Sequence, residues 1–278
     1  MVSAFKDVSR RCQIVLAAFG TSMDSSAIYV KLQERFEERF AQKIPIGFTS
    51  RVGNPKLKTV LEGISSEERL EIVITPLFMI PGKVVIDDIK KVAGEYQHHF
   101  KSIKVAKPLL PDNRVYHVLK EEILPDIKKS KCDKKGILFV GHGTPDRKSS
   151  CIYIDFAQNI KSVFPPSIKI AFGNVEFSDP YCKDILGEIV MSDIRTLVVQ
   201  PLMIVDGVHI HEDIKGVLDG GHDGNKLYHH LLDTYGEPIK KRLREITFVY
   251  KTGLGAYRGI FELFADHTIR VLSADEFL

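Results

Sequence analysis

An internal repeat constrains this chain more than any other feature of its sequence. Three segments recur at nearly constant spacing. Phe19-Gly20-Thr21 recurs as His142-Gly143-Thr144 at an offset of 123 (143 − 20), and Ile46-Gly47-Phe48 recurs as Ile170-Ala171-Phe172 at an offset of 124 (170 − 46). Pro76-Leu77 with Asp88-Ile89-Lys90 recurs as Pro201-Leu202 with Asp213-Ile214-Lys215 at an offset of 125 (201 − 76). Matches at one spacing over so long a stretch predict two copies of one structural unit.

The sequence of each copy predicts alternating strands and helices. Short apolar runs such as 13–19 and 137–140 are typical of buried strands, and amphipathic stretches such as 27–41 follow them. This alternation predicts an α/β protein with two similar lobes, each a small parallel sheet flanked by helices. We place an N-terminal lobe at 1–128 and a C-terminal lobe at 129–278, joined near the charged segment 128–135, with a ligand cleft between the lobes.

Composition excludes several classes of protein. A net charge of +3 over 278 residues argues against a dedicated nucleic-acid-binding protein. The four cysteines have no CxxC spacing, so a zinc ribbon or a cysteine-ligated iron–sulfur cluster is not expected. The sequence contains no Walker motif, which argues against a nucleotide site, and none of its apolar runs is long enough to span a membrane. We therefore expect a cytoplasmic protein without nucleotide, nucleic-acid or membrane partners; a homo-oligomer is left open.

The two copies differ at three positions that could carry chemistry. Each lies after a different strand of the second half, and its counterpart in the first half is apolar: His142 replaces Phe19, Glu176 replaces Val52, and His209 replaces Val84. Loops that follow neighbouring parallel strands meet at one edge of a sheet, where α/β folds bind ligands. We therefore predict that these three side chains converge.

Two imidazoles and one carboxylate suit a divalent ion such as Co²⁺, Ni²⁺, Fe²⁺ or Zn²⁺ and can also accept protons. Each residue also has an ordinary structural explanation. His142 could be a surface histidine in a turn, and Glu176 could favour a helix N-terminus. The repeat does not choose between His209 and His211, whose counterpart is Ile86.

Taken in order, these motifs resemble a known family. A strand followed by Gly141-His142-Gly143, a glutamate after the next strand and a Pro-Leu-Met…Gly-x-His segment after the third are similar to the anaerobic-type sirohydrochlorin cobaltochelatases, class II chelatases of the cobalamin pathway. The resemblance covers about 13–271 and includes Gly253-Leu254-Gly255. The chain departs from the family pattern at Lys83-Val84-Val85, where many relatives have Glu-Tyr, and at Ala256, where they often have Glu.

The resemblance implies insertion of Co²⁺ into sirohydrochlorin without ATP, with the metal as substrate. It assigns metal handling and catalysis to His142, Glu176 and His209. Residues in the same loops would contact the tetrapyrrole: Phe19, Thr21, Ser22, Arg51, Lys83, Thr144 and Met203. Insertion of Fe²⁺ or Ni²⁺ is the alternative within this class. A non-catalytic tetrapyrrole or metal carrier and a zinc-dependent hydrolase are the alternatives outside it.

Overall fold

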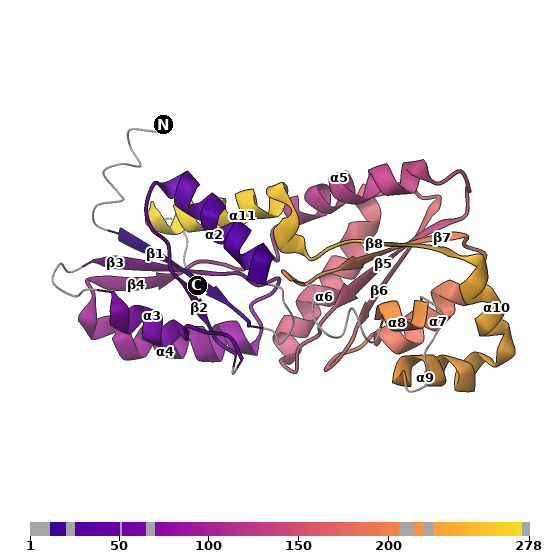
Figure 1. Cartoon of the computed structure of the whole chain (residues 1–278), viewed down its shortest axis with the longest axis horizontal. Helices are drawn as coiled ribbons and strands as arrows, with labels where there is room; N and C mark the ends of the chain where they lie inside the picture. The colour runs from indigo at the N-terminus through magenta and orange to yellow at the C-terminus, as the bar shows by residue number, and fades with distance from the viewer. Residues whose placement is uncertain are drawn as a thin grey trace. The chain divides into compact units, whose positions relative to one another are not determined.

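The computed structural model describes residues 12–20, 26–50, 52–64, 70–205, 214–218 and 225–273. The chain divides into two compact units, and each contains one four-stranded parallel sheet (Figure 1). The first unit comprises Met1–Asp112 with Gly255–Leu278, and the second comprises Asn113–Leu254. None of the described helices is both long enough and apolar enough to span a membrane.

The first unit has the sheet order β2-β1-β3-β4. Its elements are β1 (Cys12–Ala18), α2 (Ser26–Phe40), β2 (Ile46–Phe48), α3 (Leu57–Gly63), β3 (Glu71–Pro76), η1 (Val84–Ile89), α4 (Lys90–Tyr96), η2 (Gln97–His99), β4 (Ser102–Val105) and α11 (Arg258–Leu272). The short η5 (Leu254–Ala256) leads into α11.

The second unit has the sheet order β6-β5-β7-β8, which repeats the order of the first. Its elements are α5 (Arg114–Lys129), β5 (Lys135–Gly141), α6 (Arg147–Asn159), η3 (Ile160–Val163), β6 (Ile168–Asn174), α7 (Cys182–Met191), β7 (Thr196–Pro201), α8 (Gly216–Leu218), α9 (Lys226–Tyr235), α10 (Glu237–Glu245) and β8 (Thr247–Tyr250). Two parallel sheets of one topology, each flanked by helices, confirm the predicted fold class.

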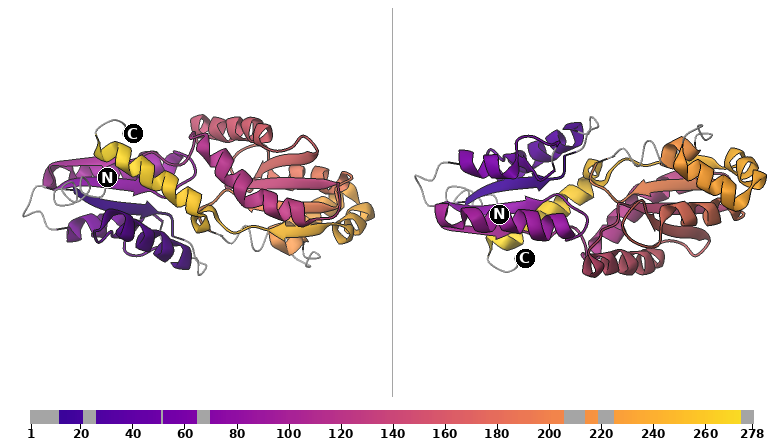
Figure 2. Two further views of the ribbon diagram at one scale, coloured as in Figure 1. Left: turned by 90° about the horizontal axis from the view of Figure 1, so that it is seen from above. Right: turned by 90° about the horizontal axis from the view of Figure 1, so that it is seen from below.

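Alternate residues of each strand face opposite helical layers, because successive side chains of a strand point to opposite sides of the sheet. In the first unit, Val15 and Ala17 join a core cluster with residues of α3 and α4. The helices α2 and α11 cover the other face, where α11 lies beside α2 and contacts β3 (Figure 2). Burial on both faces accounts for the nearly uninterrupted apolar sequence of β1.

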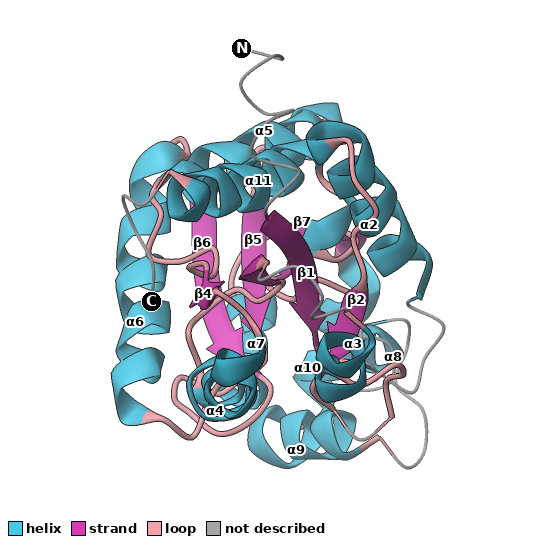
Figure 3. Cartoon of the chain, turned by 90° about the vertical axis from the view of Figure 1, so that its left-hand side faces the viewer, coloured by secondary structure: helices cyan, strands magenta, loops and turns pink. Residues whose placement is uncertain are grey.

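The second sheet is covered in the same way. Leu138 and Val140 of β5 pack with residues of α7, α9 and α10 on one face (Figure 3). On the other face, the ring of Phe139 meets Phe156 of α6 edge-on, with the ring centres 5.5 Å apart. Tyr116 of α5 packs on the same Phe156 at 5.6 Å.

The division into units differs from the predicted boundary at 128/129. The first unit ends at Asp112, so α5 belongs to the second unit, where it packs against β7 and η3. The last helix returns to the first unit. Its buried Thr268 hydroxyl is 2.7 Å from the hydroxyl of Thr75 in β3, and its His267 ring is 3.0 Å from Oδ2 of Asp112.

Two helices differ from what the sequence predicts. Ser178-Asp179-Pro180 predicts the start of a helix, but the Asn174 amide donates to the Pro180 carbonyl at 2.8 Å, and α7 begins only at Cys182. The backbone here continues beside the end of β6 before it can turn into a helix. The helix α10 was not predicted at all, although Gly236 ends α9 and Pro238 occupies the first turn of α10, where proline is favoured.

Candidate functional site

His142 and Glu176 are neighbours at the carboxyl edge of the second sheet. His142 directly follows β5, and Glu176 lies two residues beyond β6. The pairing of the two strands continues into the loops, because the Val175 amide donates to the Gly141 carbonyl at 2.9 Å and the Glu176 amide donates to the His142 carbonyl at 3.1 Å. Main-chain bonds therefore hold the residues that carry the imidazole and the carboxylate on adjacent loops.

Gly143 makes this close approach possible. Its φ is +86°, in the left-handed region that disfavours residues with a side chain. A Cβ atom at this position would lie 1.8 Å from the carbonyl oxygen of Glu176 and 3.2 Å from the Cβ of Asn174. Only glycine lets the two loops meet at this distance, which explains the glycine after His142.

Asn174 fixes the loop that carries Glu176. Its side chain is fully buried, and its Nδ2 donates to the carbonyl of Ser178 at 3.1 Å and to the Ser178 hydroxyl at 3.2 Å. The same hydroxyl accepts a bond from the Thr144 amide at 3.4 Å. Ser178 thus bridges the two loops that present His142 and Glu176.

Thr144 also stabilises the loop that carries His142. Its side chain is only 5% exposed, and its hydroxyl accepts a bond from the Asp146 amide at 3.3 Å. Asp146 in turn caps α6 by accepting from the Ser149 amide at 2.8 Å, and hydrogen bonds from Ser149 hold the pKa of this carboxyl below its usual value. The capped helix anchors the far end of the loop; a substrate contact by Thr144 stays a prediction.

Phe177 is a member of the site that the sequence reasoning missed. Its ring stacks on the imidazole of His142, with the ring centres 5.7 Å apart and an angle of 26° between the planes. The side chain is 54% exposed although its backbone has a φ of +64°, which is unusual for a bulky residue. The aromatic residue next to Glu176 was visible in the sequence, but its exposure depends on the loop conformation. Strained residues of this kind gather at functional sites.

Part of the predicted site lies outside the described residues. This applies to the third metal ligand, His209, and to Thr21, Ser22 and Arg51. Within the described ranges, no group of three or more His, Cys, Asp or Glu side chains could hold a metal ion. The set of His142, Glu176 and His209 therefore stays a prediction.

The remaining predicted contacts lie at strand ends. Phe19 directly follows β1, is 45% exposed and accepts a bond from the Tyr29 hydroxyl through its carbonyl at 2.8 Å. Lys83 is exposed and immediately precedes η1. Met203 follows β7, packs against the core cluster around Leu138, and accepts a bond from the Leu254 amide at 2.8 Å. Their contact with a substrate stays a prediction.

The strand register changes one of the comparisons between the two halves. Ala18 pairs with Phe48 in the first sheet, and Gly141 pairs with Asn174 in the second. Ser50 lies two residues after Phe48, and Glu176 lies two residues after Asn174, so Glu176 corresponds to Ser50 and not to Val52. Ser50 is buried, where it donates to the Gly20 carbonyl at 2.8 Å and accepts from the Gly53 amide at 3.3 Å. A local structural hydroxyl, not an apolar side chain, thus occupies the place of Glu176 in the first unit.

Comparison with known proteins finds family models and a protein of known name that match parts of this chain. The family model described as cobalt chelatase (CbiK) matches residues 70–273, and a model described as CbiX matches residues 13–125. A sirohydrochlorin cobaltochelatase of Sulfolobus acidocaldarius is 30% identical over 83 residues, which cover 30% of this chain and 65% of that protein. The match therefore spans slightly less than two thirds of that relative's own length.

Solved structures share the fold. SirB from Bacillus subtilis with Fe³⁺ has a TM-score of 0.68 at 14% identity and covers 96% of this chain and 98% of its own. The sirohydrochlorin chelatase SirB from Bacillus subtilis subspecies spizizenii in complex with cobalt also reaches 0.68 at 14% identity, over 95% and 96% of the two chains. The cobalt chelatase model, however, matches most of the sequence itself. The chain belongs to the cobalt chelatase (CbiK) family.

Proposed function

We propose that this protein inserts Co²⁺ into sirohydrochlorin, or a closely related tetrapyrrole, without ATP. The observation that carries the proposal is the pairing of His142 with Glu176 on adjacent loops of the second sheet. The description of the matching family supports cobalt, and the name of the Sulfolobus relative supports sirohydrochlorin.

The reaction exchanges two protons for one metal ion. Two pyrrole N–H groups lose their protons as Co²⁺ binds the four ring nitrogens, so the protein must present the ion to one face of the ring and accept protons there. A neutral imidazole can do either, and a carboxylate can accept a proton and pass it to water. We assign metal transfer to His142 and His209, one of which also takes a proton, and the proton relay to Glu176.

The surroundings of His142 support this assignment. The imidazole is partly exposed, its main-chain carbonyl is held by Glu176, and its ring is stacked on Phe177. An imidazole held in one orientation can transfer an ion with little reorganisation. Such positioning lowers the activation barrier of the reaction. The exposed ring of Phe177 also offers an apolar surface to the macrocycle, whose carboxylates would need cations such as Lys83 and Arg51.

The test is an anaerobic absorbance time course with sirohydrochlorin and Co²⁺. We expect the wild-type protein to accelerate formation of the metallated spectrum and His142→Ala to lower the rate at least about 100-fold, because general-base groups commonly contribute that much. His98→Ala is the matched control, since His98 is exposed in η2 of the first unit. A His142→Ala variant that keeps the wild-type rate would contradict the proposed roles.

The same assay separates the alternatives. A bound-pigment spectrum without acceleration over the uncatalysed reaction would replace the chelatase with a carrier. Competition between Co²⁺, Fe²⁺ and Ni²⁺ under the same conditions identifies the preferred metal, which a set of two histidines and one carboxylate does not determine by affinity alone. Cobalt is the expected winner because the family description names it.

A further inference from the structure

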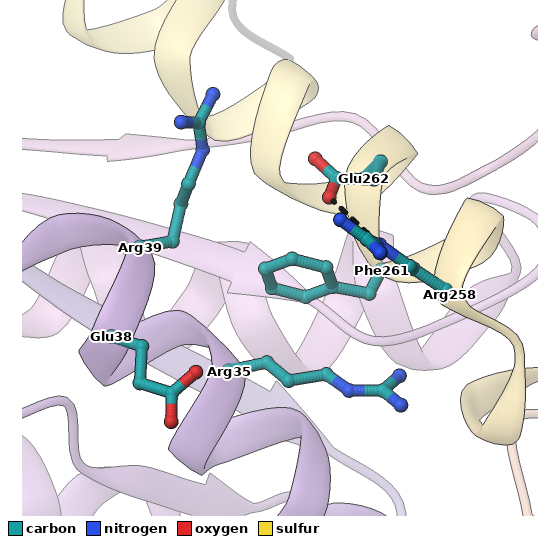
Figure 4. A pocket seen from close by; sticks show the side chains of 6 residues that line it. All are labelled: Arg35, Glu38, Arg39, Arg258, Phe261 and Glu262. Atoms are coloured by element: carbon teal, nitrogen blue, oxygen red, sulfur yellow. Dashed lines mark ion pairs between the residues drawn. The ribbon is translucent and has the colours of Figure 1, made fainter.

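The hollow between α2 and α11 of the first unit does not form a site for one ligand. It has a volume of about 440 Å³ and is lined by Arg35, Glu38, Arg39, Arg258, Phe261 and Glu262 (Figure 4). Its three guanidinium groups point in different directions, and two carboxylates lie among them. The feature that carries a further role is in the second unit, where the chain continues beyond β8.

The segment 251–254 runs beside the residues that follow β7. Pairing of the two strands continues past their ends, because the Lys251 amide donates to the Val199 carbonyl at 2.9 Å and the Leu254 amide donates to the Met203 carbonyl at 2.8 Å. Leu254 itself is fully buried. The main chain after β8 therefore supports the main chain after β7.

Gly253 lets these two stretches of main chain approach closely. A Cβ atom at this position would lie 2.7 Å from the carbonyl oxygen of Ile204 and 2.9 Å from the Cα of Val205. Both are main-chain atoms, so a change of side-chain rotamer would not relieve the clash. The φ of Gly253 lies outside the left-handed region. Glycine is therefore required here for the contact and not for the backbone conformation.

Gln200 joins the same two stretches through its side chain. It is fully buried, and its Nε2 donates to the Pro201 carbonyl at 2.7 Å and to the Thr252 carbonyl at 3.3 Å. From β5, the Val140 carbonyl accepts a bond from the Leu202 amide at 2.7 Å. The main chain that follows β7 is thus held from both sides.

The first unit has the same main-chain frame. There the Ala106 amide donates to the Ile74 carbonyl at 2.8 Å, and the Leu109 amide donates to the Phe78 carbonyl at 3.1 Å. These bonds are the counterparts of the two main-chain bonds made by the segment 251–254. The frame itself is therefore a common property of both units.

The two residues that tighten this frame occur in the second unit alone. At the corresponding positions of the first unit, Pro108 stands in place of Gly253, and Thr75 stands in place of Gln200. The first unit also has Val84 in place of the predicted metal ligand. The close approach and the amide bridge thus accompany the histidine and not the valine.

We propose that Gly253 and Gln200 are positioning residues for His209, which follows the held stretch 201–205 by four residues in the sequence. They fix the main chain that leads to this histidine and so set where the histidine meets the metal. Residues that support a metal ligand in this way commonly affect metal affinity strongly. The proposal rests on the proposed function, because it requires His209 to handle Co²⁺.

The test is a titration of metal-free protein with Co²⁺, followed through the visible absorbance of the bound ion. We expect Gly253→Ala and Gln200→Leu each to weaken Co²⁺ binding about tenfold or more and to lower the rate of insertion. Gly187→Ala is the matched control: its added Cβ would also clash, but with the ring of Tyr235 between α7 and α9. This control should lose stability and keep wild-type Co²⁺ binding.

A double-mutant cycle tests whether the effect passes through His209. In a His209→Ala background, Gly253→Ala should weaken Co²⁺ binding no further. Circular dichroism checks that each variant is folded, and Gln200→Leu, which adds no atom to the main-chain contact, keeps the test decisive if Gly253→Ala does not fold.

Three results would overturn the proposal: wild-type Co²⁺ binding by the folded variants, equal weakening by Gly187→Ala, or the full further loss in the His209→Ala background. A wild-type protein that neither binds Co²⁺ nor accelerates its insertion would contradict the proposed function itself, and this inference with it.

Discussion

At the scale of single residues, the site depends on how closely two loops can approach. His142 and Glu176 come together because Gly143 adopts a positive φ and leaves no Cβ against the Glu176 carbonyl. Phe177, also at positive φ, then covers the imidazole from one side. The chemistry-bearing residues are therefore placed by neighbours that carry no chemistry themselves.

Substitution of Gly143 tests this dependence. Gly143→Ala should lower the free energy of unfolding by at least about 2 kcal/mol, since it adds a backbone clash to a strained φ, and it should impair metal insertion. Gly236→Ala is the matched control in the same unit: its φ is +65°, but the nearest atom to an added Cβ would be 3.7 Å away. Denaturant unfolding measures both. Equal losses for the two variants would mean that the contact with Glu176 is unimportant.

The sequence singled out His142, Glu176 and His209 together, but it assigned Glu176 the wrong counterpart in the first half. The match of Ile46-Gly47-Phe48 to Ile170-Ala171-Phe172 is displaced by two residues from the observed strand register. A shift of two keeps every side chain on its own face of the sheet, so the hydrophobic pattern is equally satisfied in both alignments. Only hydrogen bonding between strands, which a sequence does not display, distinguishes them.

At the scale of elements, strands were easier to predict than helix boundaries. Buried parallel strands contain nearly continuous apolar runs, and residues 137–140 of β5 are an example. The start of α7 was predicted too early because Ser178-Asp179-Pro180 was interpreted as a helix start, and α10, which has Pro238 in its first turn, was not predicted. The buried Ile239 and Leu243, four residues apart, were the available signal for α10.

An ion pair joins α5 to the segment that follows β8. Lys251 Nζ lies 2.7 Å from Asp126 Oδ2 and donates to the Glu122 carbonyl at 2.9 Å, with the two paired side chains 16% and 19% exposed. The hydrogen bond from Lys251 holds the pKa of the Asp126 carboxyl below its ordinary value of 3.8. A carboxyl whose pKa is lowered by folding stabilises the folded state above its unfolded-state pKa.

Asp126→Asn should therefore destabilise the second unit by about 1–2 kcal/mol at pH 7. The difference from the wild type should persist down to about pH 4 and shrink as the pH falls further, through the lowered pKa of the folded state, because the wild-type carboxyl then becomes protonated. Urea unfolding at several pH values measures it. Asp193→Asn, at a 62% exposed partner of Lys134 and Lys169, should cost less than about 0.5 kcal/mol at every pH. A loss that does not change with pH would contradict this explanation.

At the scale of the whole molecule, the two units are not two contiguous halves of the chain. The first sheet receives one of its covering helices from the far end of the sequence, since α11 packs on β3 and α2. Eight residues of α11 are buried, including Phe261 and Phe264, and no repeat of the first half predicts where they pack. The predicted boundary differs from this division because an internal repeat shows which segments are alike but not which segments pack together.

Fragments of the chain should behave unequally. A fragment of residues 113–254 should fold alone, because it contains a complete sheet with helices on both faces. A fragment of residues 1–112 should not, since removal of α11 leaves Phe36 and Val73 without their buried neighbours. Joining 255–278 to the start of the shorter fragment through a flexible linker should restore folding. Amide NMR dispersion measures each outcome, and cooperative folding of 1–112 alone would contradict this view of the core.

The return of α11 sets the order in which the protein can mature on the ribosome. The last residue of α11 is made about 160 residues after Asp112, roughly 8 to 30 s later at ordinary rates of translation. Throughout that interval the first-made sheet lacks one of the helices of its apolar face, whereas the second unit is complete once Leu254 has been made, before α11 is. The N-terminal half is thus the later of the two to be completed, and it is the half that chaperones would protect during synthesis.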